Sequence, residues 1–300
     1  MECNVTGTVD TSAYPAHRPA SPPLRVLRSL RDRALDARDT VLGRHDPLVP
    51  PRRLVLVGSS QDEFRAIGQQ WVETFASQCG LGRFDRVLDI GCGIGRVAAG
   101  LARYLDELGS YEGMDVVPAG IEWCRRSITP RYPNFRFQLS DVHNAEYNPT
   151  GRVHASQYRF PWRDGEFDFV FLTSAFTHML PRDVENYLGE IARVMRPGAR
   201  CVITYFLLND ASRAQLARGE VQPGREFRHE MDGCLAVHRD NPAIAVAYPE
   251  PVVHELYERH RLRILKTHYG AWCGTPGARH IQDYVVAEKR PGADAGLGAA

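Results

Sequence analysis

Three glycines at alternate positions follow an aspartate in the segment 87–95, which reads VLDIGCGIG. Asp89 lies near the end of an apolar run, and Gly91, Gly93 and Gly95 occupy the stretch where a strand would turn into a helix. Residues without a side chain allow the backbone to come close to a ligand. The segment therefore predicts a ligand-binding loop between a strand and a helix.

The glycine spacing decides between two kinds of ligand. A nicotinamide dinucleotide calls for Gly-x-Gly-x-x-Gly, but the sixth position counted from Gly91 is Arg96, and no glycine completes the pattern from Gly93. The order Asp-x-Gly-x-Gly-x-Gly instead resembles the class I S-adenosylmethionine-dependent methyltransferases. The resemblance covers roughly residues 55–288 and includes RVMRPG at 193–198; it departs from the family at Ala199, where a second glycine is usual.

The resemblance implies S-adenosylmethionine as cofactor and assigns its contacts. In the family the glycine loop wraps the methionine part, an acidic residue after the second strand binds the ribose hydroxyls, and a polar residue after the third recognises the adenine amino group. Asp115 and Asp141 stand at those two places. Taken alone, each carboxylate would equally suit a solvated turn. The implied cofactor-binding set is Asp89, Gly91, Cys92, Gly93, Gly95, Asp115, Val116, Asp141, Val142 and Ser174.

A histidine follows the fourth expected strand, in the segment 173–178, which reads TSAFTH. Methyl transfer from a sulfonium is a direct displacement, so the enzyme aligns the acceptor and, for a hydroxyl, removes its proton. His178 is the candidate general base, because an imidazole titrates near neutral pH. The alternative is that His178 only caps the loop or holds a backbone carbonyl.

Substrate contacts are expected outside the common sheet, from an insertion at 209–249 that forms a small lid and from the loop around Trp272. The candidate substrate-binding residues are Thr177, His229, Tyr248 and Trp272, with ordinary packing as the alternative for each. No metal site is expected: His238 follows His229 by nine positions, not the four of a metalloprotease helix.

The elements that must position these residues alternate between strand and helix patterns from residue 86 onward. This predicts an α/β fold with a doubly wound, seven-stranded, mostly parallel sheet whose last strand is antiparallel, because the link at 270–280 is too short for a crossover helix. Strands are expected at 86–90, 111–115, 135–139, 167–172, 200–206, 262–269 and 281–288, and helices at 94–108 and 182–196.

Outside this domain, taken as residues 83–290, the composition changes. Residues 1–23 are proline-rich and read as a disordered tail, residues 24–82 as N-terminal helices at 24–42 and 62–79, and residues 291–300 as a flexible tail. The Arg- and Asp-rich first helix is expected to be a surface helix with ion pairs rather than a nucleic-acid-binding arm.

Charge and cysteine content narrow the partners and the location. The net charge of +1 disfavours a phosphate backbone or an anionic membrane as partner, and the seven unpatterned cysteines suit reduced thiols. No apolar run approaches the roughly 20 residues of a membrane span. We expect a cytoplasmic protein with a small-molecule acceptor, no nucleic-acid partner and no membrane insertion.

The segment TSAFTH also bears on the acceptor. It differs from the Asn/Asp-Pro-Pro-aromatic sequence of amino-directed nucleic-acid enzymes. A protein-arginine enzyme would need two glutamates in this loop, and none occurs between Phe171 and Pro181. The remaining prediction is a hydroxyl on a sugar, glycolipid precursor or secondary metabolite. Two alternatives stay open, an aminopropyl-type transferase that uses the same pocket and an inactive cofactor-binding partner subunit.

Overall fold

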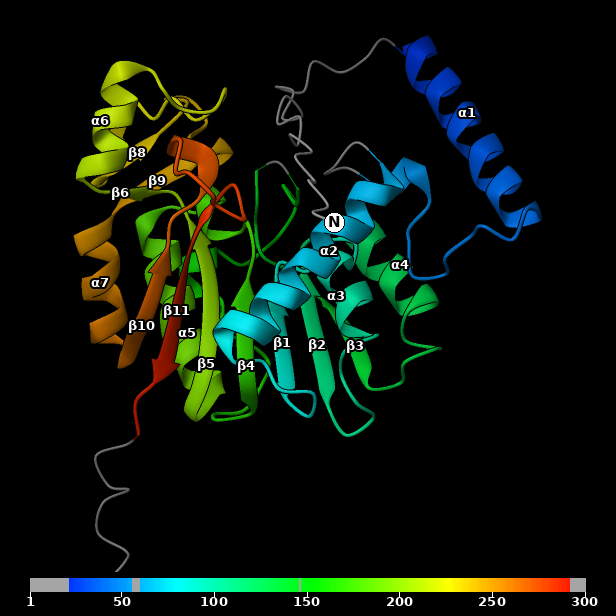
Figure 1. The fold of residues 1–300 in the computed structure, drawn as a ribbon, viewed down its shortest axis with the longest axis horizontal. Coiled ribbons are helices and arrows are strands. Elements are labelled where there is room, and N and C mark those ends of the chain that lie inside the picture. The colour runs from blue at the N-terminus through cyan, green and yellow to red at the C-terminus, as the bar shows by residue number, and fades with distance from the viewer. Residues whose placement is uncertain (1–21, 56–59, 146, 292–300) are drawn as a thin grey trace, which may run out of the picture.

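A seven-stranded sheet forms the centre of the computed structural model, which describes residues 22–55, 60–145 and 147–291. Its strand order is β10-β11-β5-β4-β1-β2-β3 (Figure 1). The strands are β1 (Arg86–Ile90), β2 (Ser110–Asp115), β3 (Phe135–Leu139), β4 (Phe167–Leu172), β5 (Met195–Tyr205), β10 (Leu262–His268) and β11 (Asp283–Lys289). Only β11 runs antiparallel to its neighbours, β5 and β10. The prediction of six parallel strands and a final antiparallel one is confirmed.

Helices cover both faces of this sheet, because its central strands are apolar on both sides. One face packs on α2 (Gln61–Thr74), α3 (Arg96–Leu101) and α4 (Pro118–Ser127). The other face packs on α5 (Pro181–Val194) and α7 (Glu250–Arg259). Along β4 the side chains alternate between the two cores, with Phe169 and Phe171 on the first and Val170 and Leu172 on the second. The doubly wound arrangement follows from this two-sided burial.

A second, four-stranded sheet lies between β5 and α7 in the chain and has the order β6-β9-β8-β7. Its elements are β6 (Leu207–Leu208), α6 (Asp210–Arg218), β7 (His229–Met231), β8 (Cys234–Ala236) and β9 (Val246–Pro249). A separate apolar cluster holds it together, with Phe206, Phe227 and Trp272 at its centre. We call this unit the lid; Figure 1 shows it above one end of the main sheet.

Two expected helix boundaries are wrong. The helix expected at 94–108 ends at Leu101, where turn-type bonds such as Tyr104 N to Leu101 O take over, and Leu108 is 81% exposed rather than buried. The helix expected at 182–196 ends at Val194, because Met195 already begins β5. Strand β5 thus ends α5 directly, whereas α3 ends in turns well before β2 begins at Ser110.

The N-terminal helix α1 (Pro22–Val41) begins before the expected 24 and stands apart from the main body (Figure 1). Arg52 binds Asp36 and Asp39 of α1 at 2.7 and 2.6 Å. Residues 1–21 and 292–300, most of both expected tails, lie outside the described residues. So does Cys3, while the other six cysteines are free thiols. No described helix is long and apolar enough to cross a membrane.

Candidate active site

The glycine loop leaves β1 and returns into α3 with all three glycines in the left-handed region, at φ of 85°, 55° and 75° for Gly91, Gly93 and Gly95. A Cβ atom added at Gly95 would meet close neighbours, and one added at Gly93 would not. A Cβ at Gly95 would lie 2.8 Å from the Cys124 sulfur, whereas at Gly93 nothing lies within 4 Å. Gly95 is therefore needed for packing on α4. Gly93 presents bare backbone to open space, as a loop that touches a ligand must.

The carboxylate of Asp115 joins this loop to the end of β2. Its two oxygens accept from the backbone N–H groups of Gly93 and Val117, at 2.7 and 2.9 Å. Burial raises the pKa of Asp115, and these N–H donors act in the opposite direction by stabilising the charge. Each oxygen keeps a second lone pair. Asp115 can therefore hold the loop and still accept from two further hydroxyl groups.

Asp89 is fully buried at the end of β1 and lacks a partner for one oxygen. The hydroxyl of Tyr111 donates to its Oδ2 at 2.7 Å, while Oδ1 has no hydrogen-bond partner. Burial raises the pKa of Asp89 to about 8, with the negative charge of Asp115 adding to the shift. An unfilled carboxylate oxygen in a buried place is costly by itself. A cation bound beside it would supply the missing partner and favour ionisation.

Asp141 lies just past β3, at the expected position, but its carboxylate is engaged within its own loop. It pairs with the Arg152 guanidinium at 2.6 Å and also accepts from the backbone N–H of that residue. These contacts lower the pKa of Asp141. Val142 is buried and pairs with Val153 in the same loop. The contacts match the turn alternative, and adenine recognition by Asp141 remains a prediction.

The turn after β4 lies against the glycine loop, since a Cβ at Gly91 would come within 3.3 Å of the Ala175 Cβ. Ser174 has a φ of 63°, which costs a non-glycine residue on the order of 1 kcal/mol. Its N–H donates to Thr204 at 2.8 Å, and its carbonyl accepts from the Thr177 hydroxyl at 3.2 Å. Strain held in place by two bonds is typical of a functional turn.

His178 closes this turn and touches the lid. Its Nδ1 lies 3.0 Å from the carbonyl oxygen of Ala243, in the segment that precedes β9. A carbonyl only accepts, so Nδ1 carries the proton and the lone pair of the neutral ring is on Nε2. The backbone contact named as the alternative is therefore present. It also fixes the tautomer that a general base requires, so the two roles are compatible.

Of the candidate substrate residues, Thr177 is part of this turn and Tyr248 reaches the residue that follows it, whereas Trp272 and His229 lie in the lid. Trp272 is fully buried in the lid cluster and its indole N–H donates to Asp283 at 2.8 Å. Tyr248 is buried, and its hydroxyl donates to the carbonyl of Met179. His229 lies on β7, the strand at the far edge of the lid sheet. Their contacts fit packing, whereas Thr177 is part of the turn itself.

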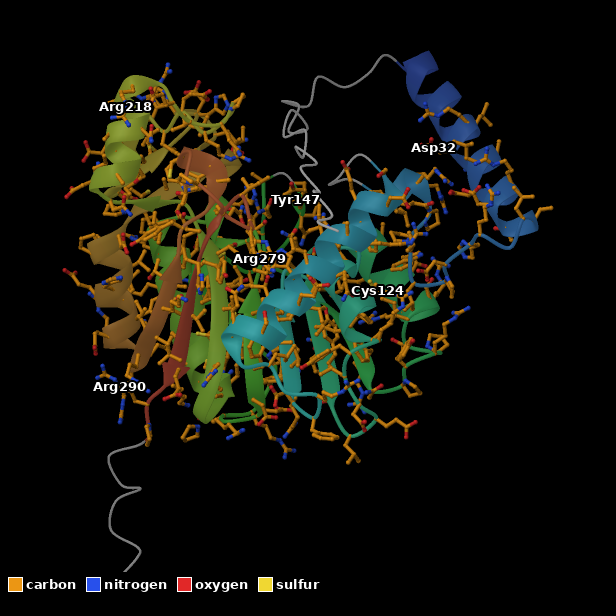
Figure 2. The ribbon with its side chains drawn as sticks, viewed as in Figure 1. Asp32, Cys124, Tyr147, Arg218, Arg279 and Arg290 are labelled. Atoms are coloured by element: carbon orange, nitrogen blue, oxygen red, sulfur yellow. The ribbon has the colours of Figure 1, made fainter. Side chains whose placement is uncertain are left out.

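The parts described so far gather at one edge of the sheet, where the parallel strands end. Figure 2 shows Tyr147 and Arg279 toward this edge, with Arg290 at the opposite end of β11 and Asp32 on the outlying α1. Ligands bind outside the carboxyl ends of strands in open α/β sheets, where the chain connections diverge. This edge is therefore the candidate active site.

Comparison with known proteins agrees with this geometry. Residues 88–203, from the middle of β1 to β5, match the family model described as a methyltransferase domain. This segment is therefore a methyltransferase domain, as the resemblance to the class I S-adenosylmethionine-dependent methyltransferases implies. Its fold is also similar to the solved PH0226 protein of Pyrococcus horikoshii, with a TM-score of 0.51 and 16% identity over 77% of this chain and 92% of that one.

Curated relatives match over part of their length. The fatty-acid O-methyltransferase of Mycolicibacterium smegmatis is 32% identical over 54% of this chain and 49% of its own. The methyltransferase GfsG of Streptomyces halstedii is 29% identical over 48% and 46% respectively. This chain thus spans about half the length of the curated relatives it matches.

The cofactor of this methyltransferase domain is S-adenosylmethionine, and the residues present fit it. The open backbone at Gly93 admits a ligand, and Asp115 retains lone pairs for two vicinal hydroxyls. The orphaned oxygen of Asp89 suits a positively charged ligand, and S-adenosylmethionine carries an ammonium and a sulfonium. When bound, it supplies a methyl group that transfers by direct displacement.

Sequence reasoning missed two residues of this site. Tyr111 reaches Asp89 because Gly113, the register partner of Asp89, has no side chain: a Cβ there would lie 2.9 Å from the Tyr111 hydroxyl. Pairing the two strands in register could have revealed this contact. Gln282 contacts both Ser174 and Thr177 from a segment more than 100 residues away, and no local pattern marks it.

Proposed function

We propose that this protein is an O-methyltransferase that moves the methyl group of S-adenosylmethionine to a hydroxyl of a small or medium-sized polar acceptor. The observation that carries the proposal is His178, whose tautomer is set by the Ala243 carbonyl and whose turn lies against the glycine loop. The names of the matched relatives, which include O-methyltransferases, support oxygen as the acceptor atom.

The residues divide the reaction between them. Asp89, Asp115 and the loop at Gly93 hold the donor, and the Ser174–His178 turn faces the acceptor. An acceptor lone pair forms the new O–C bond while the S–C bond breaks and its electron pair stays on sulfur. His178 takes the hydroxyl proton at Nε2. Alignment and proton removal need no metal ligand set.

The test is transfer of a labelled methyl group to fractionated metabolites of the source organism, with wild type and His178→Gln compared. We expect a labelled product that is stable to mild base, as an ether is and a methyl ester is not. His178→Gln should bind S-adenosylhomocysteine as wild type does while transfer falls at least about 100-fold. Equal transfer by both proteins would refute the role of His178, and labelled esters or amines would refute hydroxyl methylation.

A further inference from the structure

The side chain of Gln282 bridges two hydroxyl-bearing residues of the turn after β4. The Ser174 hydroxyl donates to Gln282 Oε1 at 3.0 Å, and Gln282 Nε2 donates to the Thr177 hydroxyl at 3.3 Å. Thr177 in turn donates to the Ser174 carbonyl. The four bonding groups form a closed chain in which every donor has a defined acceptor.

Gln282 is itself held firmly by the residues around it. Asp283, which follows it, is 1% exposed and accepts from the N–H groups of Leu207 and Gly270 at 2.6 Å each. Ile281, which precedes it, accepts from the N–H of Trp272 at 3.0 Å. The start of β11 is thus anchored to the first residue of the lid and to the loop before it. The backbone of Gln282 is therefore held in place where its side chain contacts the active-site turn.

This arrangement sets the direction of the Ser174 hydroxyl. A hydroxyl has one proton and two lone pairs, and the proton of Ser174 is used on Gln282. The remaining capacity of the exposed Ser174 oxygen is therefore to accept. The hydroxyl of a bound acceptor can donate to this oxygen on binding, before its single proton passes to His178 Nε2, whereas a carboxylate carries no proton to donate.

We propose that Gln282 is a positioning residue that fixes Ser174 as a hydrogen-bond acceptor and so makes the site select a hydroxyl acceptor over a carboxylate. This inference rests on the proposed function and deepens it. In this proposal Gln282 acts through Ser174, and Ser174 contacts the acceptor rather than the cofactor to which the resemblance assigns it. The carboxylate class matters because one matched relative is named a fatty-acid O-methyltransferase.

The first test needs no acceptor. Gln282→Met keeps the side-chain length and removes both hydrogen bonds, and Gln69→Met on the exposed face of α2 is the matched control. By amide hydrogen exchange we expect at least tenfold faster exchange at 174–178 in Gln282→Met, with no change at 91–95, in S-adenosylhomocysteine affinity or in the control. Unchanged exchange at 174–178 would overturn the positioning role, as would an equal rise across the glycine loop.

The second test measures selectivity with an alkylphenol and the alkylbenzoic acid of the same chain length as probes. We expect Gln282→Met and Ser174→Ala each to lower the hydroxyl-to-carboxyl ratio of kcat/KM about tenfold, and the double variant to lower it no further. Gln282→Glu, which still accepts from Ser174, should keep most of the ratio. Additive losses, or a ratio unchanged in Gln282→Met, would overturn the proposal. Failure of wild type to label either probe would count against the proposed function, while the exchange result still decides the role of Gln282.

Discussion

Replacing Asp89 by asparagine tests the donor site through protons rather than through activity. Burial raises the pKa of Asp89 to about 8, so at pH 7 the carboxyl of the ligand-free protein is about 0.9 protonated. If the cationic ligand pairs with the unfilled Oδ1, binding must ionise this group and release that proton. Asparagine keeps an oxygen for the Tyr111 hydroxyl but has no proton to lose.

The assay is calorimetric titration with S-adenosylmethionine at pH 7 in two buffers of different ionisation enthalpy. The heat difference gives the protons released, and subtracting the variant removes the titration of the ligand itself. We expect wild type to release about 0.9 more protons than Asp89→Asn. A bond to a charged group contributes about 1.5–3 kcal/mol, but ionising Asp89 at pH 7 costs about 1.4 kcal/mol, so affinity should fall by no more than about 15-fold in the variant. Equal proton release by the two proteins would refute the pairing of Asp89 with the ligand.

Three further predictions concern the same residues. The pKa of Asp89 is raised on folding, so its contribution to stability is present below pH 4 and is lost as pH rises toward 8. Between pH 6 and 8 the melting temperature of ligand-free Asp89→Asn should therefore fall less than that of wild type. Parallel melting curves for the two proteins would contradict this. Tyr111→Phe leaves both Asp89 oxygens without a partner and should cost about 1–3 kcal/mol in urea unfolding, so a cost below about 0.5 kcal/mol would show that the bond contributes little. Gly95→Ala should abolish S-adenosylhomocysteine binding in calorimetry, because the φ of 75° and the Cys124 sulfur leave no room for a methyl group, and binding within threefold of wild type would be the contrary result.

The main sheet was predictable because its strands carry their own signals. The bounds expected for 86–90, 135–139 and 167–172 match β1, β3 and β4 to the residue, since β1 and β4 are mostly apolar and β3 begins with alternating apolar and polar residues. The 94–108 helix was predicted too long because its apolar spacing continues past Leu101. There the chain makes a tight turn to enter β2, and Gly109 packs against the backbone of Arg83. Periodicity records which face is apolar and not where tertiary contacts end the element.

Aromatic residues near the site show a different limit. Trp272 and Tyr248 follow or precede sheet strands at the edge where ligands bind, which made them candidates for substrate contact. Their partners are far apart in the chain: Phe206 and Phe227 surround Trp272, and the carbonyl of Met179 binds Tyr248. An aromatic ring that fills a cluster from three segments has the same local sequence as one that lines a pocket. Only the packing separates the two.

The donor and acceptor sides of this site therefore differ in how they are encoded. The proposed donor side depends on backbone shape. The segment 89–95 and Asp115 form it, and the order of the aspartate and glycines in that segment is the one that resembles the methyltransferase family. The acceptor side depends on hydrogen-bond direction, which Gln282 and Ala243 impose on a turn more than 60 residues earlier. The Ala243 contact comes from a backbone carbonyl, which any residue at that position keeps, whereas a substitution of Gln282 removes the acceptor of the Ser174 proton without altering any motif. Acceptor choice can therefore diverge while the cofactor site stays constant, and selectivity variants should be sought at 282 before the glycine loop.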